Sequence, residues 1–379
     1  MKNLIFTKFI IDATKTFIAI TISIGLIVWV IQAVKFLDFV AEDGHSLKIY
    51  FLYTLLNLPK IIHRILPFVF FISLFHQINQ YELKNELLVL WSNGVNKISF
   101  IKGVIIYSML ITLFQILLGL FVSPLSQDKG RDFIRKSNID FFPSLIKAGK
   151  FIDTVTDLTI FIDSKDELGN LKNIYLKDSS NNEKNMVDSF QIIFAKSGRL
   201  LTENKNKYFK LFDGNIINNN NGELTNFKFR QFDFNLEKYT SKTTVFPKIQ
   251  EISTKELFKC IYLFKKNESE KFISRRLMCD ETRIKDIAQE FLKRIYKPVY
   301  IPLLGLVISL LILKSREVGT YNKYSFLIFF ISFSLILISE LSLRYSTSNL
   351  TGFLFFILFP LFSFLISYLL LTIKFKNKL

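Results

Sequence analysis

Few side chains in this sequence have the types and spacing that catalysis requires. The sequence contains no glycine-rich phosphate-binding loop, no zinc-ligand spacing and no nucleophile elbow. The three histidines, His45, His63 and His76, lie far apart, and none has a carboxylate or nucleophile placed to form a catalytic group. We therefore expect no catalytic residue, no metal site and no cofactor, and the remaining polar residues are candidates for binding.

Carboxylates mark one short amphipathic segment, residues 81–94. Its apolar face is predicted to carry Leu83, Leu87, Leu90 and Trp91, and its opposite face Glu82, Asn85, Glu86 and Val89. Gly94 follows the last periodic residue and predicts the end of the helix. One interpretation is a helix on a membrane surface, but such helices usually carry Lys and Arg on the polar face. The two carboxylates favour a basic protein partner instead.

Cations gather where apolar segments end. The four candidates for contact with an anionic headgroup are Lys35, Lys60, Arg131 and Arg135. Each Lys or Arg near anionic lipid contributes about 1 kcal/mol, so a site formed by several helix ends would suit such a group. Alternatively, these side chains extend to the membrane interface and bind nothing specific. Lys35 could also simply pair with Asp38.

Six apolar segments in two blocks of three must position these residues. They lie near residues 17–34, 61–78 and 98–122, and near 296–313, 324–343 and 350–373. A helix needs ~20 apolar residues to cross the ~30 Å of bilayer hydrocarbon. The segment between the blocks has the alternation of β-strands, and an open sheet cannot lie in lipid. The predicted fold class is an α-helical polytopic membrane protein with six transmembrane helices, arranged 3+3, and an inserted extracytoplasmic all-β jelly-roll-like domain.

The formal net charge of +17 is distributed by side of the membrane. With the N-terminus in the cytoplasm, the inside segments carry eleven cations: Lys2, Lys8, Lys15, Lys84, Lys97, Lys314, Arg316, Lys323, Lys374, Lys376 and Lys378. The short outside loops carry three, Lys35, Lys48 and Arg344. This bias predicts cytoplasmic termini and an outside β domain. It also explains the basic composition without a nucleic-acid partner.

The middle of the chain reads as short strands. Period-two runs occupy residues 157–164, 171–176, 190–195, 208–212 and 227–236, with turn residues between them. In the last run the apolar positions move one residue out of phase between Phe229 and Phe232, which predicts a β-bulge. The expected domains are helices one to three in 1–126, the β domain in 127–250, a helical connector in 251–297, and helices four to six in 298–379.

Several other polar residues receive a structural interpretation. Cys260 and Cys279 lie outside, where a disulfide is allowed, but two cysteines without a framework favour unpaired thiols. His63 and Arg64 follow Lys60 by one turn, and Glu340 lies in the fifth span. Each could face a cavity, but we prefer a structural role for them.

Local patterns carry a resemblance to a known family. Asn85-Glu86-Leu87-Leu88-Val89 followed by Gly94 is similar to an S-E-[LI]-x-V-x-x-x-x-G pattern, with Asn in place of Ser. Pro59-Lys60 with Pro67, Lys35-Phe36-x-Asp38, and Ser123-Pro124 with Arg131 also have counterparts there. These are patterns of the LptF/LptG permeases, and the resemblance covers essentially the full length. It is closer to LptF, but residues 289–294 lack the His of the LptF E-L-H-x-R-L stretch, so that choice stays open.

The resemblance implies a permease subunit of an ABC exporter in the bacterial inner membrane, which extracts lipopolysaccharide from the outer leaflet. Its implied partners are an LptG-like paralogous permease, an LptB-like cytoplasmic ATPase dimer, and LptC- and LptA-like periplasmic jelly-roll proteins. The ATPase-coupling residues would be Glu82, Glu86, Leu87, Trp91 and Gly94, and the lipid A phosphates would meet Lys35, Lys60, Arg131 and Arg135. Lipid would leave through the β domain, whose open edge strand could pair with the next jelly roll.

Two other classes of function remain open. A non-transporting scaffold whose β domain binds envelope proteins would explain the topology, but it needs neither the acidic segment nor the proline-rich second span. A secondary transporter is a weaker alternative, because no span carries the buried charged pair or the broken helices expected of one.

Overall fold

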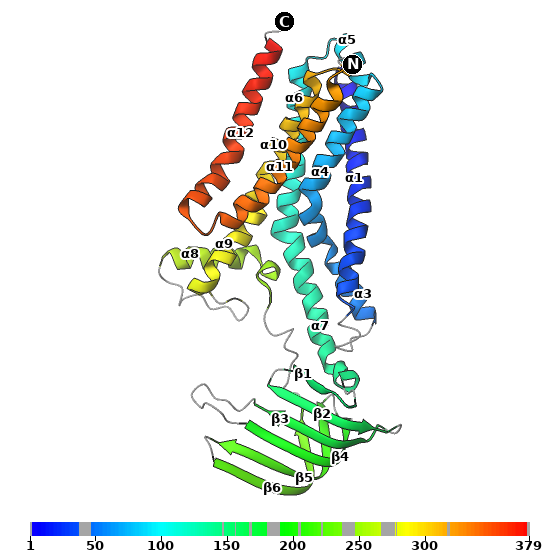
Figure 1. The fold of residues 1–379 in the computed structure, drawn as a ribbon, viewed down its shortest axis with the longest axis vertical. Helices are drawn as coiled ribbons and strands as arrows, with labels where there is room; N and C mark the ends of the chain where they lie inside the picture. The colour runs from blue at the N-terminus through cyan, green and yellow to red at the C-terminus, as the bar shows by residue number, and fades with distance from the viewer. Residues whose placement is uncertain are drawn as a thin grey trace. The chain divides into compact units, whose positions relative to one another are not determined.

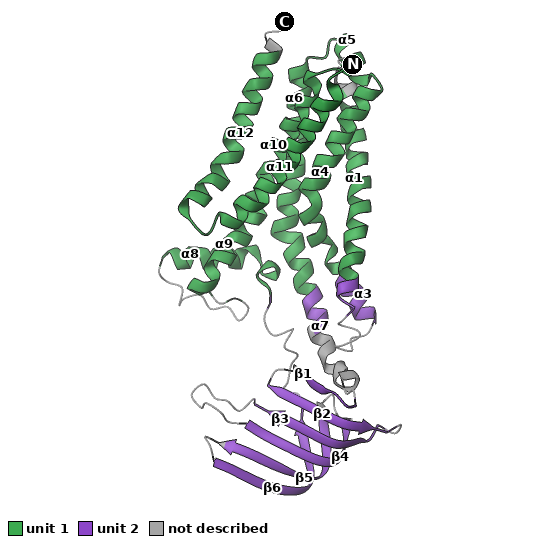
Figure 2. Cartoon of the chain, viewed as in Figure 1, with its two compact units in different colours: residues 1–33, 55–129, 248–379 green, residues 34–54, 130–247 purple. Residues whose placement is uncertain are grey.

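The computed structural model describes residues 2–37, 47–145, 148–155, 157–166, 169–179, 190–203, 206–220, 223–236, 247–266, 277, 279–316 and 319–376. The chain divides into two compact units (Figure 2). The helical unit comprises residues 1–33, 55–129 and 248–379. The sheet unit comprises residues 34–54 and 130–247.

Along the sequence, helices make up most of the chain before and after the strands, and Figure 1 labels them. Those before it are α1 (Lys2–Lys35), α3 (Leu47–Leu56), α4 (Leu58–Leu83), α5 (Glu86–Ser92), α6 (Lys97–Leu117), the π-helical turn η1 (Leu118–Val122) and α7 (Ser123–Leu145). Those after it are η2 (Ile249–Glu251), α8 (Thr254–Lys265), α9 (Glu281–Ile295), η4 (Lys297–Val299), α10 (Tyr300–Ile308), η5 (Ser309–Leu313), α11 (Tyr321–Tyr345) and α12 (Leu350–Lys376).

The predicted spans are confirmed as helices. Six segments of the described chain are long and apolar enough to cross a membrane: Phe6–Lys35, Leu47–Leu83, Lys97–Ile134, Glu281–Leu313, Tyr321–Tyr345 and Leu350–Lys374. Large apolar side chains stay exposed along α1, α11 and α12. A helix surface of this kind suits lipid or another apolar helix rather than water.

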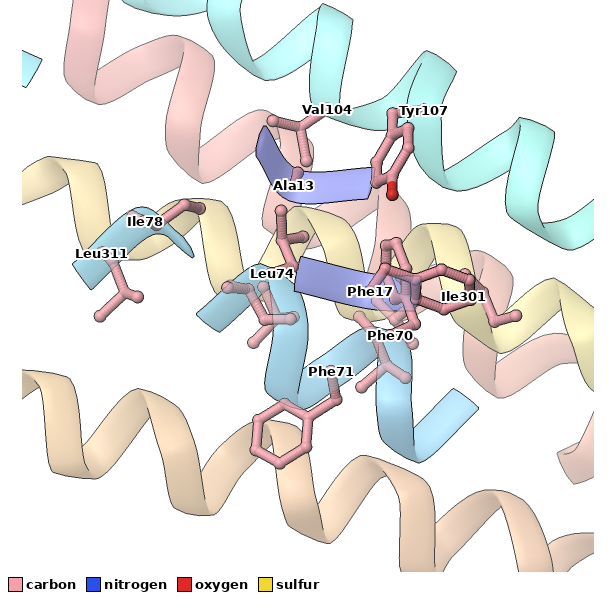
Figure 3. Packing of buried hydrophobic residues seen from close by; sticks show 14 of the residues in the cluster. Ala13, Phe17, Phe70, Phe71, Leu74, Ile78, Val104, Tyr107, Ile301 and Leu311 are labelled. Carbon is pink, nitrogen blue, oxygen red and sulfur yellow. The ribbon is translucent and has the colours of Figure 1, made fainter. Parts of the chain in front are cut away.

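The core of the helical unit forms around α10. Every residue of α10 is buried, and α10 packs against α4, α6, α11 and α12. Figure 3 shows Phe70 and Leu74 of α4 with Val104 of α6 and Ile301 of α10 in one apolar cluster. Since these side chains recur at helical spacing, each helix turns one continuous apolar face toward the cluster.

The sheet unit contains one antiparallel sheet. Its strands are β1 (Phe151–Val155), β2 (Leu158–Lys165), β3 (Leu171–Asp178), β4 (Phe190–Glu203), β5 (Asn206–Asn220) and β6 (Glu223–Asn235). They lie side by side in the order β1-β2-β3-β4-β5-β6 (Figure 1). The predicted inserted all-β domain is confirmed, and its described strands form a meander without the crossing connections of a Greek key.

The predicted bulge in the last strand is wrong. The apolar positions of β6 do change phase, but β5 and β6 keep one pairing register from Tyr208↔Asn235 to Asn220↔Glu223. Neighbouring strands change phase together: in β5, Leu211 is buried before Asp213 and Ile216 after it. Asp213 and Asn173 have positive φ angles of 49°. The sheet therefore bends along a row of residues, with no extra residue in one strand.

Candidate functional site

The predicted amphipathic segment 81–94 forms two helices. α4 continues through Tyr81 to Leu83, and Asn85, with φ 58°, separates it from α5, which begins at Glu86. The prediction of one continuous helix from Tyr81 to Gly94 is therefore wrong. The apolar pattern alone does not reveal that the backbone of Asn85 adopts a left-handed conformation. Gly94, with φ 74°, ends α5 as predicted. The amide of Val95 donates to the carbonyl oxygen of Leu90 at 3.2 Å, which completes a Schellman cap.

The inner face of α5 rests on aromatic side chains. Leu87 and Leu90 are buried. Trp91 packs edge-on against Phe100 of α6 with ring centroids 5.7 Å apart, and Phe9 of α1 lies 4.8 Å from Phe100. Leu83, which was predicted on the same face, is exposed in α4. A displacement of α5 would therefore press on α6 and, through Phe100, on α1.

The outer face of α5 combines apolar and acidic groups. Leu88 and Val89 are exposed, and Glu86 is partly exposed beside Lys8, with Nζ 3.7 Å from Oε2. Glu82 lies in α4 instead, where its Oε1 accepts a hydrogen bond from the Arg316 amide at 2.8 Å. The two predicted carboxylates thus have different roles, since Glu86 is available to a partner and Glu82 anchors the segment before α11.

Side-chain hydrogen bonds tie the helices together behind α5. The Tyr81 hydroxyl donates to Asp12 Oδ2 of α1 at 2.7 Å, and the Tyr321 hydroxyl of α11 donates to Asn79 Oδ1 of α4 at 2.7 Å. In α1, the Thr16 hydroxyl donates to Gln77 Oε1 at 2.9 Å. The end of α4 is therefore joined by side chains to both α1 and α11.

The other end of the helical unit contains a basic pocket of about 830 Å³. It lies between the first turns of α4 and α7, the return segment 248–250, α9, η4 and the last turn of α11. Its cations are Lys60, Arg64, Lys248, Lys293, Lys297 and Arg344, and its carboxylates are Asp286, Glu290 and Glu340. His63 lines the same pocket. The excess of cations suits an anionic ligand with several charged oxygens.

Arg294 of α9 organises one wall of this pocket although it is only 1% exposed. Its Nη1 donates to the carbonyl oxygen of Ile252 at 2.9 Å and to Thr254 Oγ1 at 3.0 Å, and its Nη2 donates to the Gln250 carbonyl at 2.9 Å. Its Nε lies 3.1 Å from Glu290 Oε1. A single buried guanidinium thus fixes the return segment, which carries Lys248, against α9.

The cations of the pocket divide into paired and unpaired groups. Lys297 pairs with Glu340 of α11, and Lys293 pairs with Glu290, Nζ to Oε2 2.9 Å. Within the described chain, Lys60, Arg64, Lys248 and Arg344 form no ion pair with a carboxylate. These four define the open basic set of the pocket, which is free to bind phosphate or carboxylate oxygens.

The four predicted headgroup contacts do not all lie in this pocket. Lys60 lines it. Lys35 and Arg131 belong to the sheet unit, where Arg131 is buried. Arg135 lies in α7, but its side chain is outside the described residues. Among the described residues, no group of three or more His, Cys, Asp or Glu side chains is placed to hold a metal ion.

Sequence reasoning missed most of the open basic set. The sequence predicts a structural role for Arg64 and only a loop charge for Arg344, and it predicts no role for Lys248. One signal could have found the region: the run Lys293-Arg294-Ile295-Tyr296-Lys297 places three cations just before an apolar span. Glu340, also interpreted as structural, is the counter-charge of Lys297.

The two cysteines form a disulfide between Cys260 of α8 and Cys279, just before α9. The prediction of unpaired thiols is therefore wrong. The Cα atoms are 5.8 Å apart, within the range that a disulfide needs, because α8 and α9 pack together around Leu257 and Ile287.

Comparisons with known proteins agree with this architecture. The chain is 26% identical over 238 residues to the uncharacterized protein RP871 of Rickettsia prowazekii (strain Madrid E), an alignment that spans 62% of this chain and 64% of that protein. The family model described as "Lipopolysaccharide export system permease LptF/LptG" matches residues 9–374, nearly the whole sequence. The chain therefore belongs to the LptF/LptG family of multi-pass inner-membrane permeases.

Proposed function

We propose that this chain is the non-catalytic permease subunit of an ABC exporter that extracts lipopolysaccharide from the outer leaflet of the inner membrane. Membership of the LptF/LptG family supports the substrate class and the partner types. The partners would be a paralogous permease, a cytoplasmic ATPase dimer, and periplasmic jelly-roll proteins that receive the lipid. Both chain termini lie in the cytoplasm in this proposal, and the sheet unit lies in the periplasm.

The open basic set binds the phosphates of the lipid A headgroup. Figure 1 shows α5 and α9 toward opposite ends of the helical unit, so a cytoplasmic α5 puts the pocket near the outer leaflet. Each cation near an anionic headgroup contributes about 1 kcal/mol. The four unpaired cations would therefore contribute about 4 kcal/mol, or close to a thousandfold in affinity.

The helix α5 docks into the partner ATPase. Its exposed surface of Leu88, Val89 and Glu86 combines apolar area with one carboxylate, which suits a groove with a basic rim. Leu87 and Trp91 hold the helix to the core, and Gly94 lets the chain turn into α6. Movement of the ATPase would then be transmitted through Phe100 to α1 and α6.

The sheet carries the lipid onward. Its inner face gathers aliphatic side chains, among them Ile162, Leu176, Ile193 and Leu211. This face would open around the acyl chains, and an edge strand would add to the next jelly roll. Lys35, Arg131 and Arg135 remain candidates for contact with the substrate.

The unpaired cations of the pocket are the observation that carries this proposal. To test it, Lys60, Arg64, Lys248 and Arg344 are all replaced by Gln. Binding of radiolabelled lipopolysaccharide is then measured with the reconstituted exporter complex in nanodiscs. We expect at least a hundredfold loss of affinity, because most of the charge attraction is removed.

A matched control replaces four exposed lysines of α8 and α9: Lys255, Lys259, Lys265 and Lys285. This variant changes the net charge equally but leaves the pocket intact, so its affinity should stay near that of the unchanged chain. Equal affinities for the two variants would mean that lipopolysaccharide is bound elsewhere.

A further inference from the structure

A row of aromatic side chains crosses the sheet unit on the face opposite its core. The pairing registers align Phe151 of β1 with Phe161 of β2, Tyr175 of β3 and Phe194 of β4. The centroids of Phe151 and Phe161 are 4.7 Å apart, and those of Tyr175 and Phe194 are 5.2 Å apart. The same alignment continues into Asn215 of β5 and Lys228 of β6.

Packing within the sheet does not account for this row. Cross-strand aromatic pairs stabilise a sheet when their rings are covered, yet Phe151 is 68% exposed and Phe194 is 46% exposed. The core of the sheet unit lies on the other face, where Ile160, Ile193 and Leu211 are buried. The row therefore offers apolar ring surface to a ligand from outside the unit.

Polar side chains adjoin the rings. A hollow of about 640 Å³ is lined by Phe161, Tyr175 and Phe194 together with Asn215, Lys196 and Lys228. The bend of the sheet contributes to it, because Asn173 and Asp213, which both have a positive φ at the bend, also line the hollow. Amides, a carboxylate and ammonium groups supply both donors and acceptors beside the aromatic surface.

This combination selects one class of ligand. A sugar ring has apolar C–H faces that stack on aromatic rings and a rim of hydroxyls that require donors and acceptors. A protein partner would favour an interface core depleted in Lys and Asp, and acyl chains would leave the polar groups unpaired. With strands ~4.8 Å apart, the row from β1 to β6 spans about 24 Å, which is long enough for several sugar units.

We propose that this face of the sheet binds the oligosaccharide part of the transported glycolipid, along the row from Phe151 to Lys228. The inference rests on the proposed function for the identity of the cargo, but the binding site itself does not. The acyl chains would occupy the core face while the sugars track the outer face. One sheet would thus hold both parts of an amphipathic cargo.

The test uses a deacylated and dephosphorylated lipopolysaccharide core oligosaccharide and the full-length chain in nanodiscs. Since this probe has no acyl chain and no phosphate, the core face should not recognise it, and the basic pocket loses the phosphate groups that it is proposed to bind. Its affinity is measured by titration calorimetry, with saturation-transfer NMR to identify the protons in contact. We expect saturable binding that weakens roughly fivefold on Phe194→Ala and further on Phe194→Ala with Tyr175→Ala.

The matched control is Phe227→Ala, which removes a ring of comparable exposure (58%) that does not line the hollow. Affinity of this variant for the oligosaccharide should be unchanged. Absence of saturable binding to the unchanged chain, or an equal loss for Phe194→Ala and Phe227→Ala, would overturn the proposal. So would loss of a co-purifying protein or of vesicle binding on Phe194→Ala without any effect on the sugar, since the row would then be a protein or lipid surface.

The result is independent of the proposed function. If the core oligosaccharide binds to the row while the pocket variant still binds intact lipopolysaccharide normally, the sugar site stands and the proposed headgroup site fails. If the oligosaccharide does not bind to the row and the pocket variant loses affinity for intact lipopolysaccharide, only the sugar site is excluded.

Discussion

Different kinds of interaction stabilise the two ends of the helical unit. Around α5, aromatic rings and side-chain hydrogen bonds from tyrosine hydroxyls join α1, α4, α6 and α11, and Lys8 with Glu86 forms a partly exposed ion pair. Around the pocket, the buried Arg294 of α9 binds the carbonyl oxygens of Gln250 and Ile252, and Lys297 of η4 pairs with Glu340 of α11. Close apolar packing transmits displacement, while fixed charges in a pocket are preorganised for an ionic ligand. On this contrast we propose that the end around α5 is mechanical and that the end around the pocket binds the ligand.

The largest effect is expected from breaking the charge network at the binding end. Arg294→Met leaves Glu290 without its partner and removes the donors to the return segment. Breaking a buried pair in this way costs roughly 3–5 kcal/mol. Thermal unfolding in detergent, followed by circular dichroism, measures the loss.

Arg344→Met is the matched control for Arg294→Met. It removes another arginine of the pocket, one that is exposed and has no carboxylate partner in the described chain. Its stability should change by less than about 0.5 kcal/mol. If the two variants unfold at the same temperature, the Arg294 network does not stabilise the binding end.

Removal of the disulfide is expected to cause the next largest loss of stability at the same end. Cys260→Ser with Cys279→Ser removes a link between positions 19 residues apart. Such a closed loop contributes roughly 3 kcal/mol in the chain-entropy description. Limited proteolysis of the connector between α8 and α9 should speed up markedly, with the cleavage sites read by mass spectrometry. Unchanged proteolysis would show that apolar packing around Leu257 suffices.

A smaller loss of stability is expected when a side chain is added to the closely packed end around α5. A Cβ at Gly103 of α6 would overlap the ring of Phe6 on α1. Gly103→Ala should therefore cost roughly 1–3 kcal/mol and should lower transport more than it lowers lipopolysaccharide binding. Phe6→Leu on the Gly103→Ala background should restore both stability and transport, and absence of rescue would argue against contact between α1 and α6 as the transmission path.

The smallest stability effect concerns Glu86. Its ion pair with Lys8 is partly exposed, so Glu86→Gln should change the free energy of unfolding by less than about 0.5 kcal/mol. Coupling of ATP hydrolysis to extraction should nevertheless fall, because the carboxylate is proposed to bind the ATPase. Lys8→Gln removes the same ion pair but keeps the carboxylate, and should leave coupling intact. Equal coupling in both variants would exclude Glu86 from the contact.

Prediction from sequence succeeded where the relevant pattern is local. Apolar runs such as 98–122 specify spanning helices because the bilayer requires continuous apolar surface. Alternation in 157–164 specifies a strand because one face is buried. Gly94 ends α5 because its backbone adopts a positive φ, which glycine allows at low cost.

Prediction failed where distant residues meet or a single dihedral decides. Lys60, Lys248 and Arg344 are far apart in sequence, and only the fold brings them into one pocket. The disulfide depends on how α8 and α9 pack. A single left-handed residue, Asn85, divides a pattern that reads as one helix. The bend of the sheet at Asp213 looked like a bulge because one strand alone does not reveal its neighbours' phase.

The most direct test of a mechanical end and a binding end compares two variants in reconstituted complexes. Photocrosslinking of lipopolysaccharide to the permease, and ATP-dependent release to the jelly-roll acceptor, are measured on the same samples. We predict that Glu86→Lys keeps crosslinking but abolishes release, whereas Gln at Lys60, Arg64, Lys248 and Arg344 abolishes crosslinking. Normal release by the Glu86→Lys complex, or normal crosslinking with the four Gln residues, would contradict this division of roles.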